Sequence, residues 1–230
     1  MTPKKMKKTN PSATVNFNSE EVFELKRLVA EGEGHQLEFK RKASHPEKIV
    51  REMIAFANTE GGTLLVGVDD NGSLTGVKYP DEELLSVREA LDKYLRQSLI
   101  FQDSVIALSE NRFVLRLDIP PHLKRPILFW IDARRAESYV RVNDMSIKAS
   151  PEMIEIIRRK RQKKDIRFYF AEHELALMKY LDQFPFITLM EFQKLTGLNQ
   201  YVASRKLILL VLANVLKIMA TDKGDLYSRV

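Results

Sequence analysis

The chain has 230 residues, of which 44% are hydrophobic and 30% are charged, and its formal net charge is +6. This composition is typical of a soluble globular protein of one or two domains, and the sequence has no run of about 18 apolar residues that would cross a membrane. The chain has no cysteine, which excludes disulfides, thiolate ligands and cysteine nucleophiles and fits a cytoplasmic protein.

The positive charge lies in two short runs. Residues 1–20 predict a disordered basic arm, and because no apolar segment follows its lysines, the arm does not resemble a signal peptide. These lysines are Lys4, Lys5, Lys7 and Lys8. The second run, RRKRQKKDIR at 158–167, has seven basic residues and one acidic residue. Each run is either a solvated surface segment or a contact for nucleic-acid phosphates.

Residues 36–40, with the sequence QLEFK, predict a β-strand. Successive side chains of a strand point to opposite faces, so Leu37 and Phe39 share one face while Glu38 and Lys40 share the other. We expect the apolar face to pack in the core and the opposite face to present charge.

A helix and a buried strand are expected next. Apolar residues recur at helical spacing over residues 46–58, and the Gly-Gly pair at 61–62 ends the helix because glycine continues a helix only at a cost. Residues 63–68 predict a buried strand, in which Gly67 lets another backbone or a ligand approach closely. An Asn-Gly pair then predicts a tight hairpin into residues 74–77.

The middle of the chain predicts a helix and further strands. The helix is expected at 82–99, and strands are expected at 105–108, 113–119 and 127–131. We expect these strands to build a mixed sheet that Tyr139–Val142 closes. Tyr139 and Arg141 would share one face of that last strand, which suits base stacking or phosphate contact. The alternative, which we favour, is that Arg141 pairs with a carboxylate such as Glu38.

The end of the chain predicts helices and a strand pair. Ser150 and Pro151 suit the start of a helix that ends the first domain, because serine caps helices and proline is tolerated in the first turn. Further helices are expected at 171–181, 189–195 and 201–216, with a strand pair that turns at 223–224. This order is typical of a winged helix, and the short turn at 196–200 suits a helix-turn-helix.

The start of the third of these helices is the candidate nucleic-acid contact. Tyr201, Ser204 and Arg205 share one face at the end of the helix that would enter a DNA groove. The candidate contact residues here and in the basic run are Asn199, Gln200, Tyr201, Ser204, Arg205, Lys206, Arg158, Arg159, Lys160 and Arg161. The alternative is a packing or dimerisation module without DNA contact, which the apolar run at 207–216 also fits.

Several motifs in the first domain resemble the Schlafen-like DNA-binding domain family of the AlbA_2 type. They are Glu33, LEFK at 37–40, AFANTEGG at 55–62, GVDD at 67–70, YVRV at 139–142 and Ala149-Ser150. The resemblance extends over about residues 23–157. It implies an α/β domain, and bacterial relatives of this kind are mostly regarded as DNA-binding regulators, often with a winged helix behind the domain.

The same resemblance permits an enzyme. In some Schlafen-type domains the equivalents of Glu33, Glu38 and Asp70 form a three-carboxylate site that cleaves RNA with a divalent metal. Mg²⁺ or Mn²⁺ would polarise a phosphoryl oxygen there, and Lys40 would hold the phosphate. The alternative is structural, with Glu38 and Lys40 forming a local ion pair and Asp70 shaping the turn. ATP hydrolysis is not expected, because the chain has no GxxxxGK[ST] loop.

We therefore predict a mixed-sheet α+β or α/β Schlafen-like domain followed by a smaller winged-helix domain. The expected boundaries are an arm at 1–20, the Schlafen-like domain at 21–157, a basic linker at 158–168 and a winged helix at 169–230. The predicted function is nucleic-acid binding, most specifically as a cytoplasmic DNA-binding transcriptional regulator that acts as a homodimer. RNA is an alternative ligand, and a metal-dependent nuclease is the alternative function; binding alone would need no cofactor.

Overall fold

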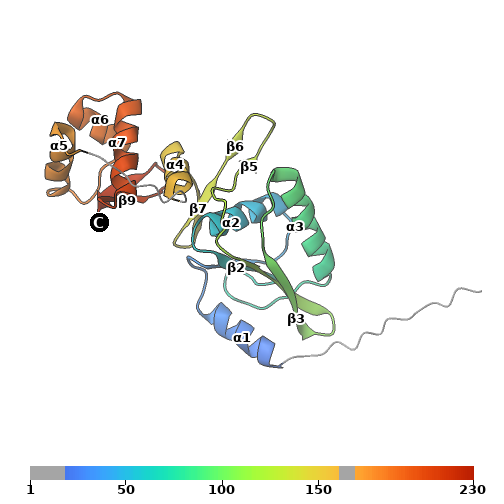
Figure 1. The fold of residues 1–230 in the computed structure, drawn as a ribbon. Coiled ribbons are helices and arrows are strands. Elements are labelled where there is room, and N and C mark those ends of the chain that lie inside the picture. Colours follow the sequence, from blue (N-terminus) through green and yellow to red (C-terminus); the bar gives the residue numbers. More distant parts are fainter. Residues whose placement is uncertain (1–18, 161–168) are drawn as a thin grey trace, which may run out of the picture.

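A computed structural model describes residues 19–160 and 169–230 of the chain (Figure 1). The predicted basic arm lies outside these residues except for its last two positions, which begin a helix. The predicted linker from Arg161 to residue 168 also lies outside them. Within the described residues, no helix combines the length and apolar character needed to span a membrane.

The described residues form a mixed α+β protein with small sheets. The helices are α1 (Ser19–Ala30), α2 (Pro46–Asn58), α3 (Pro80–Tyr94), α4 (Pro151–Lys160), α5 (Glu172–Leu181), α6 (Leu189–Thr196) and α7 (Gln200–Leu212). The strands are β1 (Leu37–Lys40), β2 (Gly62–Val66), β3 (Gln102–Ser109), β4 (Arg112–Ile119), β5 (Phe129–Trp130), β6 (Ala136–Glu137), β7 (Tyr139–Val142), β8 (Met145–Lys148), β9 (Leu216–Met219) and β10 (Leu226–Arg229). The helix expected at 82–99 is α3, which ends at Tyr94.

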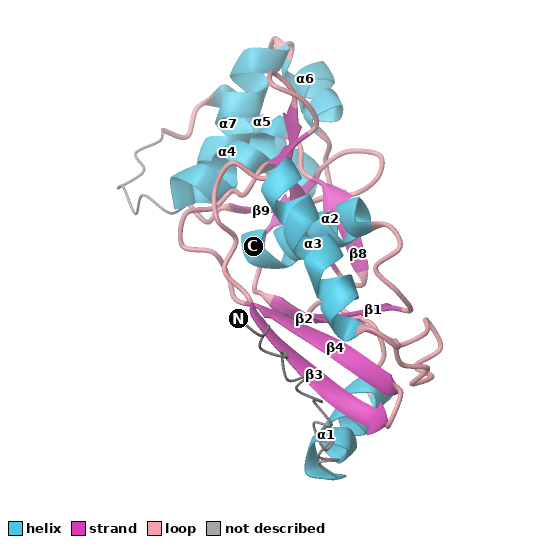
Figure 2. Cartoon of the chain, turned by 90° about the vertical axis from the view of Figure 1, so that its right-hand side faces the viewer, coloured by secondary structure: helices cyan, strands magenta, loops and turns pink. Residues whose placement is uncertain are grey.

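The first part of the chain is built on a four-stranded mixed sheet in the order β1-β2-β4-β3. β1 runs parallel to β2, with Glu38 opposite Leu64, and the other two strand pairs are antiparallel. Helices α2 and α3 cover one face, and α1 covers the other, where Leu37 and Phe39 pack against Leu25 (Figure 2). The predicted apolar face of β1 is confirmed.

Some segments expected to join this sheet lie outside it. The prediction that Tyr139–Val142 closes the sheet was wrong, because β7 pairs with β8 instead. Residues 127–131 contribute only the short strand β5, and residues 74–77 form isolated bridges rather than a strand. The buried side chain of Asn58, at the end of α2, donates a hydrogen bond to Tyr139 O at 3.0 Å. This bond links β7 to the end of α2.

Gly61 and Gly67 have left-handed backbone conformations, with φ of 82° and 106°. A Cβ atom on Gly67 would lie 2.9 Å from Phe113 O, and one on Gly61 would lie 2.7 Å from Ile119 O. Both positions therefore require glycine, because a side chain would meet rigid backbone as well as an unfavourable φ. The expected close approach of another backbone to Gly67 is confirmed.

The last part of the chain has three helices followed by an antiparallel hairpin. Thr188 caps α6 through a capping box with Glu191, and Gly197 ends α6 with a φ of 70°. The hairpin of β9 and β10 folds back on the helices, and Ile187 forms a bridge with Tyr227. The buried side chains at its centre are Leu177, Phe192, Leu207, Leu210 and Tyr227.

Helix α4 connects the two parts. As predicted, Ser150 caps its start, accepting a hydrogen bond from Met153 N at 2.9 Å. Met153 packs with Val140 of β7, whereas Ile156 packs in the core of the C-terminal helices. The three basic residues at its end, expected to begin the linker, instead form its last turn. One helix thus packs against β7 of the first part and against the C-terminal helices.

Candidate functional site

The charged face of β1 contacts a buried arginine. Glu38 is 5% exposed, and its Oε2 atom lies 2.7 Å from Nη2 of Arg141, whose side chain is 1% exposed. The other carboxylate oxygen, Oε1, accepts a hydrogen bond from Lys40 Nζ. The pairing of Arg141 with Glu38, favoured from the sequence, and that of Glu38 with Lys40 are both present. Each oxygen of Glu38 is thus engaged by a cation.

A second carboxylate, Glu52 of α2, completes this cluster and was missed in the sequence. Its Oε2 atom lies 3.0 Å from Arg141 Nη1 and accepts a hydrogen bond from Ser146 Oγ. Glu52 lies one turn before the buried Phe56 in α2. An acidic residue at such a position was the available signal, because buried charges in proteins are normally paired.

Backbone carbonyls fix the Arg141 side chain further. Its Nη2 atom donates to Gly34 O at 2.9 Å and to Leu37 O at 3.2 Å, and its guanidinium lies 4.9 Å from the centre of the Phe56 ring. Arg141 is therefore a buried connector between β7, β1 and α2. Its burial removes Arg141 from the surface that nucleic acid would contact, which argues against its predicted role in nucleic-acid binding.

Burial perturbs two carboxyl groups of this region. Desolvation raises the pKa of Glu52, the neighbouring Glu38 charge raises it further, and Ser146, Lys40 and Arg141 only partly offset the rise. Desolvation also raises the pKa of Glu33, although its Oε1 atom accepts a hydrogen bond from Phe39 N at 2.8 Å. Both groups bind a proton more readily in the folded chain than in the unfolded chain.

The predicted metal ligands Glu33, Glu38 and Asp70 do not form a prepared metal site. In the part of the chain that the structure describes, no group of three or more histidine, aspartate and glutamate side chains is arranged to hold a metal ion. A divalent ion at Glu38 would have to displace Arg141 and Lys40. The residues present therefore do not fit a resident Mg²⁺ or Mn²⁺.

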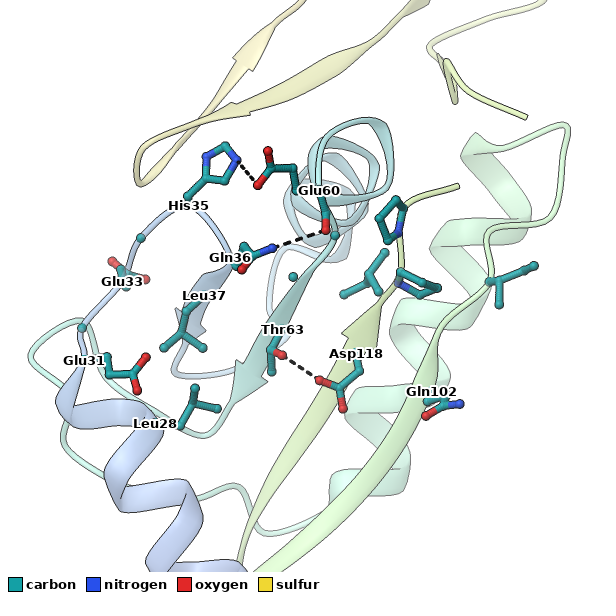
Figure 3. Close-up of a pocket in the computed structure, with 18 residues that line it drawn as sticks. Leu28, Glu31, Glu33, His35, Gln36, Leu37, Glu60, Thr63, Gln102 and Asp118 are labelled. Carbon is teal, nitrogen blue, oxygen red and sulfur yellow. Dashed lines mark hydrogen bonds and ion pairs between the residues drawn. The ribbon is translucent and has the colours of Figure 1, made fainter. Parts of the chain in front are cut away.

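A cavity of about 680 Å³ opens beside Glu33 (Figure 3). Its acidic side chains are Glu31, Glu33, Glu60 and Asp118, and His35 Nε2 lies 3.7 Å from a Glu60 oxygen. Asp118 accepts a hydrogen bond from Thr63 Oγ1 at 2.6 Å. Acidic linings repel phosphate groups, so this cavity is a poor site for a nucleic-acid backbone.

The start of α7 carries the exposed candidate residues. Tyr201 is 68% exposed, and its hydroxyl accepts a hydrogen bond from Arg205 Nη1 at 3.0 Å. Asn199 caps the helix, because its Oδ1 atom accepts a hydrogen bond from Val202 N at 3.0 Å. Gln200 is exposed at the first position of the helix. These four side chains lie at one end of α7.

Other candidates make contacts within the protein. Ser204 Oγ donates to Glu152 of α4 at 2.6 Å, and Lys206 pairs with Glu174 of α5. At the end of α4, Arg158 pairs with Glu155 at 2.6 Å. Arg159 and Lys160 complete the last turn of that helix. The structure therefore separates the exposed pair of Tyr201 and Arg205 from Ser204 and Lys206, which contact neighbouring helices.

A family comparison identifies the first part of the chain. Residues 33–150 match the model of the Schlafen AlbA_2 family, so the chain belongs to that family. The match covers the whole ion-pair cluster of Glu38, Glu52 and Arg141 and ends where α4 begins.

Two solved structures are similar to parts of the chain. One is the amino-terminal domain of a RecG-related protein from Nitrosomonas europaea, with 20% identity over 65% of this chain and 94% of that chain, and a TM-score of 0.41. The other is the DIP2311 protein from Corynebacterium diphtheriae, with 17% identity, a TM-score of 0.45 and coverage of 90% of this chain but only 42% of that chain. No curated protein is similar enough to be matched to this chain.

Proposed function

We propose that this protein is a DNA-binding transcriptional regulator whose residues 169–230 form a winged helix. The order of α5, α6 and α7 followed by the β9–β10 hairpin supports this assignment. The observation that carries the proposal is the division of α7 into two faces. Tyr201 and Arg205 are exposed, whereas Leu207 and Leu210 are buried. A recognition helix needs this division, because one face packs on the core of its domain while the other face enters the major groove of DNA.

The chemistry of the exposed face suits a duplex. An arginine contacts guanine edges or phosphates, a tyrosine hydroxyl contacts phosphates, and Asn199 and Gln200 offer amides that read base edges. Arg159 and Lys160 at the end of α4 add positive charge. Because one module with so few basic residues would bind weakly, we propose a homodimer that contacts two half-sites and gains affinity through effective concentration.

The first domain acts in this proposal as a scaffold rather than a nuclease. Glu38, which the nuclease alternative requires as a metal ligand, is engaged by Arg141 and Lys40. The nuclease alternative predicts that Glu33→Ala, Glu38→Ala and Asp70→Ala each abolish metal-dependent cleavage of RNA. If the protein is instead a regulator, the purified wild type does not cleave RNA, and these substitutions have no cleavage to abolish.

One gel experiment separates these functions. The protein is incubated with labelled duplex DNA, single-stranded DNA or structured RNA, with Mn²⁺ or with EDTA, and both retention and cleavage are measured. We expect a salt-sensitive shift of duplex DNA that does not depend on metal and is not accompanied by cleavage. Preferential retention of RNA, or Mn²⁺-dependent cleavage that Glu38→Ala removes, would contradict the proposal.

A further inference from the structure

A second cavity, of about 660 Å³, lies where the first domain meets the C-terminal part. Thr59 and Val140 line one wall, at the end of α2 and in β7, and Ile157 and Met219 line the other, in α4 and β9. Helix α4 and β9 lie beside β7 (Figure 1). Small-molecule sites typically measure about 300–1,000 Å³ and often form between domains, so both the size and the place fit a ligand site.

The wall from the C-terminal part is apolar. Met153, Ile156, Ile157, Ile218 and Met219 all face this cavity. Met219 remains 41% exposed although it lies within a strand. Apolar surface that the protein's own side chains leave uncovered in a cleft favours an apolar ligand, because burying that surface against the ligand removes it from water.

The residues that line the cavity carry more positive than negative charge. Arg125 and Lys160 line it, and neither has a carboxylate partner within 4.0 Å among residues 19–160 and 169–230. Arg125 is held in place, because its Nη1 atom donates to Thr59 O at 2.7 Å. The other charged lining groups have partners: Glu60 lies 3.7 Å from His35, and Arg141 pairs with the carboxylates described above.

We propose that this cavity, which we call the inter-part cleft, binds a small molecule with an apolar body and one anionic group, such as a medium-chain carboxylate. The apolar body lies against Ile157 and Met219, and the anionic group lies between Arg125 and Lys160. Arginine and lysine together suit a carboxylate because their hydrogen bonds to it are charge-assisted.

A regulatory consequence follows, and it rests on the proposed DNA-binding function. The ligand contacts β7 on one wall and both α4 and β9 on the other, so its binding changes how the C-terminal helices are held relative to the first domain. Because Ser204 of α7 contacts Glu152 of α4, such a change reaches the helix that carries Tyr201 and Arg205.

Calorimetric titration of the full chain with 8-anilino-1-naphthalenesulfonate tests the site, because this probe joins an aromatic body to one sulfonate. Met219→Trp fills the cleft and Lys160→Gln removes a charge, and we expect each to raise the dissociation constant at least about fivefold. Matched controls are Met145→Trp, at a 48% exposed methionine of strand β8, and Lys194→Gln, in the last turn of α6. Equal binding by Met219→Trp and the wild type would overturn the proposal.

Competition tests the anionic group, and a DNA arm keeps the two proposals distinct. Decanoate should displace the probe at least about fivefold better than decanol, and equal displacement would refute the anionic selectivity. Decanoate should also change retention of duplex DNA by the wild type but not by Met219→Trp. If the protein retains no DNA at all, the proposed function fails while the calorimetry still decides the site. If decanoate binds but leaves DNA retention unchanged, the regulatory consequence is wrong.

Discussion

Replacing Arg141 with methionine should destabilise the protein strongly, because it leaves the buried carboxylate of Glu38 and the partly buried carboxylate of Glu52 without their shared cation. Methionine keeps most of the apolar volume of the side chain, so the change isolates the lost charge. The guanidinium lies 2.7 Å from Glu38 and 3.0 Å from Glu52, and the arginine side chain is only 1% exposed. Removing one partner of a buried ion pair costs about 3–5 kcal/mol, and since Lys40 remains beside Glu38 we expect about 3 kcal/mol.

Urea unfolding at neutral pH measures this loss. The matched control is Arg135→Met, because Arg135 pairs with Asp132 at 3.5 Å on the surface, where ion pairs contribute little to stability. The loss in Arg141→Met should shrink as the pH falls, since desolvation raises the pKa of Glu52, Arg141 no longer lowers it, and Glu52 then takes up a proton more readily than in the unfolded chain. A loss below about 1 kcal/mol, equal to that of the control, would show that Arg141 does not stabilise the fold through these carboxylates.

Three further predictions concern stability. Gly67→Ala should cost about 1–3 kcal/mol in urea unfolding, because its Cβ would meet Phe113 O, whereas Gly224→Ala has a similar φ but open space and should cost less. The pKa of Glu33 is raised in the folded chain, so the wild type loses stability as the pH rises above 4.5. Glu33→Gln cannot lose this stability, so its free energy of unfolding should rise relative to that of the wild type over the same range. Parallel pH profiles of the two proteins would contradict this. Thr188→Ala removes the cap of α6 and should cost about 1 kcal/mol, measured in the same way; an unchanged value would contradict the assigned cap.

Short sequence patterns predicted the elements whose structure depends mainly on residues near them in the chain. The alternation of Leu37 to Lys40 assigned both faces of β1, and the Ser-Pro pair located the start of α4. The need for glycine at position 67 was also visible, because an isolated glycine in a buried strand marks a close backbone approach.

Contacts between distant segments were harder to predict. β7 reads as a sheet strand by its alternation, but it pairs with β8 and packs against α2, where the Asn58 amide donates to Tyr139 O across 81 positions of the sequence. Glu52 was overlooked because its role depends on Arg141, which is 89 positions away. The pairing of Arg141 with Glu38 was foreseen because a site rich in acidic residues favours a cation nearby.

We propose that the exposed face of α7 binds DNA, and the salt dependence of duplex binding is the measurement that tests this contact. Fluorescence anisotropy over a range of salt concentrations compares the wild type with Arg205→Ala and with Arg27→Ala, a control at an exposed arginine of α1. We predict that Arg205→Ala weakens binding. If Arg205 contacts a phosphate, the slope of the logarithm of the binding constant against the logarithm of the salt concentration should decrease in magnitude by about 1; if it contacts a base, the substitution should cost about 1–3 kcal/mol of binding free energy. If Arg205→Ala and Arg27→Ala bind duplex DNA with the same affinity and the same salt dependence, the exposed face of α7 does not bind DNA.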